Sequence, residues 1–133
     1  MRYLLDTNIC IYIAKRRPPT VLARFEQLQP GDIGMSVITL FELSYGAWKS
    51  DRPEKTLEAI HSLTRLIPVV PLDASTSGHC GRLRADLERK GRSIGAYDLL
   101  IAAQALSLDV IMVTNNVREF DRVPGLKMEN WAV

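Results

Sequence analysis

The segment Val110-Ile111-Met112-Val113-Thr114-Asn115-Asn116 decides the fold class of this chain. Its first four residues are apolar and mostly β-branched, which is typical of a buried strand, and the polar residues after them can begin a helix. The same order occurs at the other end of the chain, where Tyr3-Leu4-Leu5 precedes Asp6-Thr7-Asn8. Both ends therefore predict a buried strand that passes directly into a helix.

Between these two ends, short apolar runs alternate with segments of helical periodicity. The segment after Asp98 is apolar on nearly every side, which predicts a central, buried helix. Thr20 is expected to cap the second helix. Such alternation predicts an α/β fold, a three-layer α/β/α arrangement with a short, twisted, mainly parallel sheet of four to five strands flanked by helices. The expected strands are 3–5, 33–36, 68–72, 110–113 and a short edge strand near the end, and the expected helices lie at about 9–15, 20–28, 40–48, 53–67, 73–90 and 96–106.

Length and composition indicate one ordinary globular domain over residues 1–133. The net charge of +2 permits a nucleic-acid partner without requiring one. No apolar run approaches the roughly 20 residues of a membrane span, and the acid at position 6 comes too early for a signal peptide, so a cytoplasmic location is expected. Cys10 and Cys80 are expected to be small buried residues, since two cysteines make a disulfide framework unlikely.

Four acidic residues lie where strands are expected to pass into helices, and core-type residues flank them. A carboxylate inside an apolar run is costly to bury unless it is paired or binds a cation. In open α/β sheets, sites lie at the carboxyl ends of the strands, so acids from opposite ends of the chain should meet at one edge. We therefore expect one shared cation site formed by Asp6, Glu42, Asp98 and Glu119.

Carboxylates and amides without histidine or cysteine suit Mg²⁺ or Mn²⁺ and do not suit zinc. His61 and His79 lie on expected helices away from the acids. Each acid also has a purely structural interpretation: Asp6 and Asp98 can be helix caps, Glu42 a first-turn acid favoured by the helix dipole, and Glu119 a solvated charge. The joint pattern favours a metal site that acts on phosphodiesters.

These residues carry a family resemblance. The four acids and the residues around them form sequence motifs that resemble those of a PIN domain. More narrowly, they resemble the motifs of the VapC-type toxins of bacterial toxin–antitoxin pairs, over nearly the whole chain. Each motif alone is weakly specific, whereas the four in this order are specific. The motifs are Leu5-Asp6-Thr7-Asn8, then Glu42, then Tyr97-Asp98-Leu99-Leu100-Ile101-Ala102-Ala103, then Val113-Thr114-Asn115-Asn116-Val117-Arg118-Glu119-Phe120.

The resemblance implies a Mg²⁺- or Mn²⁺-dependent endoribonuclease that cuts structured RNA, commonly tRNA or a ribosomal RNA loop, and so inhibits translation and growth. It implies Asp6 and Asp98 as the principal metal ligands, with Glu42 and Glu119 completing the site directly or through water. Where many PIN domains have an aspartate, this chain has Asn116, which leaves Glu119 as the fourth acid. The supporting residues implied by the match are Thr7, Asn8, Thr114 and Asn116.

The same resemblance implies a homodimer and a cognate VapB-type antitoxin, which places a basic side chain among the acids and binds operator DNA. The apolar residues Tyr45, Trp48 and Leu66, near the ends of their helices, could form a dimer or antitoxin surface or equally belong to the core. The segment Gly91–Gly95 could hold substrate or serve only as a turn. Two rival functions stay open from the sequence: a metal-dependent phosphatase or DNA nuclease on the same acids, and a non-catalytic nucleic-acid-binding module.

Overall fold

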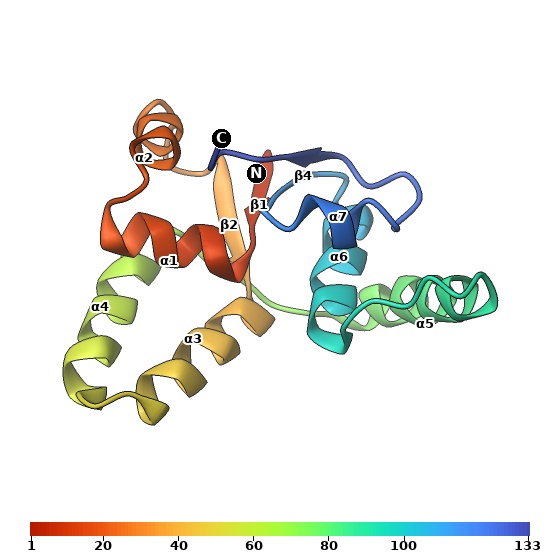
Figure 1. The fold of residues 1–133 in the computed structure, drawn as a ribbon, viewed down its shortest axis with the longest axis horizontal. Coiled ribbons are helices and arrows are strands. Elements are labelled where there is room, and N and C mark those ends of the chain that lie inside the picture. The colour runs from red at the N-terminus through yellow and green to blue at the C-terminus, as the bar shows by residue number, and fades with distance from the viewer.

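Five short strands form a parallel sheet at the centre of the computed structural model, which describes all of residues 1–133 (Figure 1). The strand order is β3-β2-β1-β4-β5, and every neighbouring pair is parallel. The predicted α/β class and the small, mainly parallel sheet are therefore confirmed. The strands are β1 (Tyr3–Leu5), β2 (Ile33–Ser36), β3 (Val69–Val70), β4 (Ile111–Val113) and β5 (Met128–Glu129).

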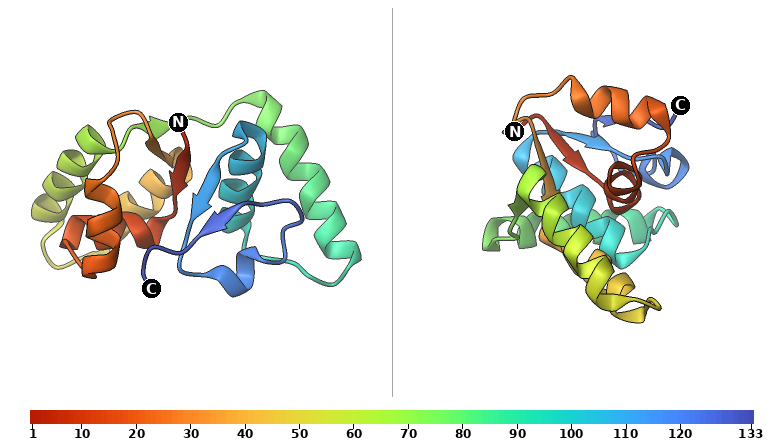
Figure 2. Two further views of the ribbon diagram at one scale, coloured as in Figure 1. Left: turned by 90° about the horizontal axis from the view of Figure 1, so that it is seen from above. Right: turned by 90° about the vertical axis from the view of Figure 1, so that its left-hand side faces the viewer.

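Helices cover both faces of this sheet and make the three predicted layers. Figure 2 shows α1, α2 and α4 on one side of the strands and α5 with α6 on the other. The central helix α6 contributes six buried residues, in agreement with its apolar sequence. The helices are α1 (Thr7–Lys15), α2 (Pro19–Glu26), α3 (Val37–Lys49), α4 (Pro53–Leu66), α5 (Ala74–Arg89), α6 (Ala96–Leu108) and α7 (Val117–Phe120).

The side chains of β1 alternate between two hydrophobic cores, as the two-residue period of a strand requires. Tyr3 and Leu5 point into the core under α1, α2 and α4, where Trp131 packs edge-on against Tyr3. Leu4 points into the other core, under α5 and α6, which Phe120 of α7 also enters. The sheet is thus buried on both faces, as expected for parallel strands.

The strand register brings the ends of β1, β2 and β4 to one edge. Leu5 pairs with Met35 on one side and with Val113 on the other, and the Asp6 N–H donates to the Val113 carbonyl at 3.0 Å. The strand order reverses between β1 and β4, which is the position where open α/β sheets place their sites. The fold thus brings Asp6 and the Thr114–Asn116 segment together.

Several local expectations from the sequence are wrong. Thr20 does not cap α2, because the helix begins at Pro19 and Pro18 occupies the cap position. Proline suits this first turn because its missing N–H is not needed there. Cys10 is buried as predicted, but Cys80 is only half-buried. No helix combines the length and the apolar character that crossing a membrane requires.

Candidate active site

Asp6 is both a helix cap and a buried acid at the centre of the candidate site. It follows β1 directly, and its Oδ1 accepts the Ile9 N–H at 2.9 Å, which caps α1. Only 6% of the residue is exposed. The structural and functional interpretations of Asp6 are therefore compatible, because the cap fixes the carboxylate at the sheet edge.

Burial raises the pKa of Asp6 to about 6, and the negative charge of Glu42 adds to this effect. Hydrogen bonds from Thr114 and from the Ile9 N–H act in the opposite direction but do not offset the loss of water. An aspartate with this pKa is poorly compensated by the protein alone. A cation would supply the missing stabilisation of its charged form.

Asp98 lies in the first turn of α6 and forms a pair with Glu119. Burial raises the pKa of Asp98 to about 7, and the charges of Glu119, Glu42 and Asp6 raise it further. This dependence places all four predicted acids within electrostatic reach of one another. The neighbouring Glu119 carboxylate therefore disfavours the charged form of Asp98 and favours its protonated form, while the pKa of Glu119 is lowered.

Glu119 is held by polar groups from two other segments. Its Oε1 accepts the Gly95 N–H at 2.9 Å, and its Oε2 accepts the Asn116 side-chain amide at 2.6 Å. Partial burial acts to raise the pKa of Glu119, but these hydrogen bonds and the charge of Arg122 outweigh it and lower the pKa below its usual value. Asn116 therefore orients Glu119, the fourth acid. This gives a role to the amide side chain that stands where many PIN domains have an aspartate.

Glu42 is placed by a hydroxyl from a different element. It lies just beyond the first turn of α3, within the range expected from the sequence, and its Oε1 accepts the Thr7 hydroxyl at 2.8 Å. The Thr7 hydroxyl also lies 3.3 Å from that of the buried Thr39. Thr7 thus links the start of α1 to the acid on α3.

Of the other predicted supporting residues, the side chain of Thr114 faces one of the acids and that of Asn8 does not. Thr114 is buried, faces Asp6 and accepts the Asn116 N–H at 2.9 Å. Asn8 lies 3.5 Å from Asn115, whose amide donates to the Tyr12 hydroxyl at 2.8 Å. Thr114 and Asn116 therefore support the site directly, whereas Asn8 contributes to its rim.

None of the four acids forms an ion pair with a lysine or arginine. All four ion pairs of the chain join other residues. The side chains also do not form a closed cage, since no group of three or more His, Cys, Asp or Glu is placed to hold one metal ion. Direct ligation of one cation by all four acids is therefore not supported by this geometry.

This donor set fits a hard divalent cation that keeps part of its water shell, because Mg²⁺ is commonly held by only one or two carboxylates. Gly95 lies beside two of the acids. A Cβ at this position would stand 3.7 Å from both Asp98 Oδ2 and Glu119 Oε1, which is an ordinary van der Waals distance. The segment that ends at Gly95 therefore borders these two carboxylates.

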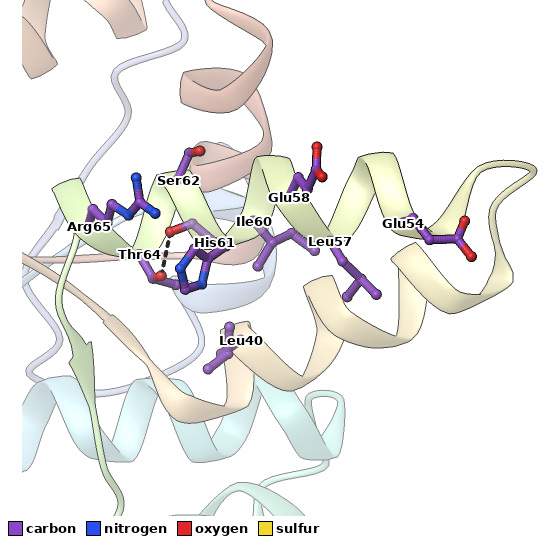
Figure 3. A pocket seen from close by; sticks show the side chains of 9 residues that line it. All are labelled: Leu40, Glu54, Leu57, Glu58, Ile60, His61, Ser62, Thr64 and Arg65. Carbon is purple, nitrogen blue, oxygen red and sulfur yellow. Dashed lines mark hydrogen bonds between the residues drawn. The ribbon is translucent and has the colours of Figure 1, made fainter.

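A hollow of the surface lies away from the acids. It measures about 830 Å³ and is lined by Leu40 and by residues of α4 that include His61 and Arg65 (Figure 3). The one hydrogen bond drawn there joins the Thr64 hydroxyl to the His61 carbonyl. None of the four acids lines this hollow, so it is separate from the candidate site, and His61 lies away from the acids as expected.

A second hollow of about 450 Å³ reaches the site through Glu42. It lies between α1, α3 and α4 (Figure 1), and apolar residues form most of its wall. Lys15 and Lys55 also line this hollow. It therefore forms an apolar groove that leads to an acidic end.

Sequence reasoning missed three residues of the site. From the sequence, Thr39 and Asn115 are interpreted only as possible helix caps, and Gly95 only as part of a segment that could hold substrate or form a turn, not as a contact of a site acid. Thr39 and Gly95 each precede a site acid by three residues, Glu42 and Asp98 respectively, which places them on the same side of a helical turn. That spacing is the signal that could have found them.

The chain matches the family model described as PIN domain over residues 3–126. It is 46% identical over 132 residues to the tRNA(fMet)-specific endonuclease VapC of Shigella flexneri, covering 99% of both chains. It is 43% identical to ribonuclease VapC2 of Haemophilus influenzae, again over 99% of both. The structure is similar to a chain of DNA-bound VapBC from Salmonella typhimurium, with a TM-score of 0.93, 41% identity and 98% coverage of both chains.

Proposed function

The chain belongs to the PIN-domain family and, within it, to the VapC ribonucleases, and from this premise we propose that its four acids cut structured RNA with the help of a divalent cation. It is the toxin of a toxin–antitoxin pair and a nuclease. The observation that carries the site assignment is the meeting of Asp6 and Asp98 at the β1–β4 switch point, both with raised pKa values and neither in an ion pair.

Mg²⁺ or Mn²⁺ is the proposed cofactor, held by Asp6 and Asp98, with Glu42 and Glu119 acting directly or through water. Such a cation polarises a phosphoryl oxygen and makes hydroxide available near neutral pH. The oxygen-only donor set supports this choice over zinc.

The chain's own residues prepare the site in two ways. Thr7 directs Glu42 toward the acids, and Asn116 with the Gly95 N–H directs Glu119. Asp98, whose pKa is raised to about 7, must lose its proton before it can act as a charged ligand, which links activity to pH. The buried position of Asp6 also keeps its carboxylate from exchanging freely with bulk water.

A VapB-type antitoxin is the proposed partner, and through it operator DNA. The apolar groove between α1, α3 and α4 suits an apolar segment of such a partner, and its acidic end suits a basic side chain. An arginine there would form the ion pair that Glu42 and its neighbours lack within this chain. A homodimer is proposed from the family alone.

The test is substrate competition with purified, antitoxin-free protein. RNA, DNA of the same sequence and a simple phosphate ester are offered together in Mn²⁺, with tRNA(fMet) as the first RNA because a relative is named for it. The expected result is discrete RNA fragments that vanish in EDTA and in Asp98→Asn, while Asp86→Asn, at a surface acid paired with Arg89, cuts normally. Preferential hydrolysis of the ester or of DNA would contradict the ribonuclease. Metal-independent binding without any cutting would support the binding module instead.

A further inference from the structure

Two exposed aromatic side chains stand beside the acids. Phe41 and Tyr97 are 50% and 48% exposed, and their ring centroids lie 5.4 Å apart with the ring planes at 72°. Each ring belongs to the residue immediately before a site acid, Phe41 before Glu42 and Tyr97 before Asp98. The aromatic pair therefore borders the same opening as the acidic pair.

This arrangement comes from the meeting of two helices. The helices α3 and α6 contact each other, and each carries an aromatic residue immediately followed by an acid near its N-terminal end. Successive residues of a helix point about 100° apart, so that the acids turn toward the sheet edge while the aromatics turn outward. The two aromatic side chains are thus exposed to solvent, each next to a half-buried acid of the site.

The pair has no evident role in holding the fold together. Neither ring belongs to either buried core cluster, and about half of each ring remains in contact with solvent. The Tyr97 hydroxyl forms no hydrogen bond with any other group of the protein, so it is free to meet a polar group from outside. Exposed aromatic surface beside a site commonly marks a binding surface.

We propose that Phe41 and Tyr97 form a stacking platform for an unpaired RNA base next to the phosphodiester that is cut. The proposal rests on the proposed ribonuclease function. Sequence-specific RNA recognition usually engages single-stranded loops, whose splayed bases stack on aromatic rings. The edge-to-face contact holds each ring in place in the free protein, which lowers the ordering cost of stacking.

The platform explains how an acidic site can hold a polyanion. The four carboxylates repel phosphate until a cation is present, so affinity must come partly from uncharged contacts. Stacking on an aromatic ring supplies such a contact, tolerates different bases and leaves the cation free to meet the phosphate. An enzyme built this way selects unpaired loops over duplex RNA.

The test uses RNA hairpins that carry 2-aminopurine at each loop position in turn, with wild-type protein and four variants. Binding is measured in Ca²⁺, with a gel to check that the RNA stays intact. Phe41→Leu and Tyr97→Leu keep the apolar volume and remove the ring, while Tyr97→Phe keeps the ring. Trp48→Leu is the matched control, because Trp48 is 65% exposed on the same helix and lies seven residues, about 10 Å, farther along it.

We expect wild-type protein to quench 2-aminopurine at one loop position. Phe41→Leu and Tyr97→Leu should lose that quench and weaken binding by about fivefold to a hundredfold, equivalent to roughly 1–3 kcal/mol. Tyr97→Phe and Trp48→Leu should behave as wild type. An abasic residue at the quenched position should abolish the difference between wild type and the two leucine variants.

Wild-type quench and affinity in both leucine variants would overturn the platform. So would a change in molecular mass by light scattering with unchanged RNA affinity per protomer, which would make this face a contact between two copies of the chain. An equal loss in Trp48→Leu would also overturn it. If wild-type protein cuts RNA in Mn²⁺ but shows no quench, the platform alone fails. If it shows the quench but never cuts, the ribonuclease fails and the platform stands.

Discussion

Replacing Asp6 with asparagine should make the metal-free protein more stable at pH 8. The Asp6 carboxylate is buried, has no cationic partner and has a pKa raised to about 6 from 3.8. Asparagine has nearly the same shape and can still accept the Ile9 N–H as a helix cap. The substitution therefore removes a poorly solvated charge and keeps the hydrogen bond that begins α1.

The magnitude follows from the pKa shift of Asp6. A rise of about two units corresponds to about 3 kcal/mol of stability that wild-type protein lacks once Asp6 is ionised. Because the folded pKa of Asp6 lies above its unfolded one, the contribution of Asp6 to stability is fully present below about pH 4 and is lost as the pH rises through about 6. Asp6→Asn should thus gain about 1–3 kcal/mol at pH 8, or several degrees of melting temperature, and nothing at pH 4.

The assay is urea unfolding in EDTA from pH 4 to pH 8. Asp73→Asn is the matched control, since Asp73 caps α5 by accepting the Thr76 N–H at 3.1 Å but is exposed on the surface. Hydrogen bonds from Ser75 and the Thr76 N–H lower the pKa of Asp73, so its replacement should reduce stability at pH 8. If Asp6→Asn were equally or less stable than wild type at pH 8, Asp6 could not be a buried carboxylate whose charged form lacks stabilisation in the absence of a cation.

Further predictions concern the metal, the pH profile and two supporting residues. In scanning calorimetry, saturating Mn²⁺ should raise the melting temperature of wild-type protein by an amount set by the ratio of the Mn²⁺ concentration to its Kd. The same Mn²⁺ concentration should have little effect on the melting temperature of Asp98→Asn. At low Mn²⁺, single-turnover cleavage should increase as the pH rises through about 6 to 7, because the pKa values of Asp6 and Asp98 lie there; a rate independent of pH in that range would contradict the assignment. Thr7→Val should reduce kcat/KM about tenfold through loss of its hydrogen bond to Glu42 while leaving the circular dichroism spectrum unchanged. Asn116→Ala should reduce it by a similar factor by freeing Glu119, and Asn116→Gln should not restore it, which distinguishes orientation from polarity.

The sequence predicts the architecture well because hydrophobic periodicity reflects burial directly. The apolar runs 3–5 and 110–113 correspond to adjacent strands β1 and β4, and the all-apolar segment after Asp98 corresponds to the buried helix α6. Asp6 could be placed at the strand end, and the topology rule for α/β sheets then predicts its neighbourhood. These elements depend on local pattern, which a single sequence contains.

The remaining details depend on contacts between distant residues. The hydrogen bond of Thr7 to Glu42 spans 35 positions and that of Gly95 to Glu119 spans 24, so no local pattern reveals them. The exposure of Phe41 and Tyr97 likewise follows from how α3 and α6 meet. Both residues are of core type by composition, and the packing of the two helices leaves them half-exposed.

The most direct test of the central claim is the dependence of RNA cleavage on Mn²⁺ concentration. Cleavage of tRNA(fMet) is followed under single turnover for wild-type protein, Asp98→Asn and Asp86→Asn, with EDTA as the zero-metal point. We expect wild type and Asp86→Asn to follow the same saturating curve from no cleavage in EDTA, and Asp98→Asn to stay near zero throughout. Cleavage by Asp98→Asn at the wild-type rate, or full wild-type activity in EDTA, would contradict a metal-dependent ribonuclease centred on these acids.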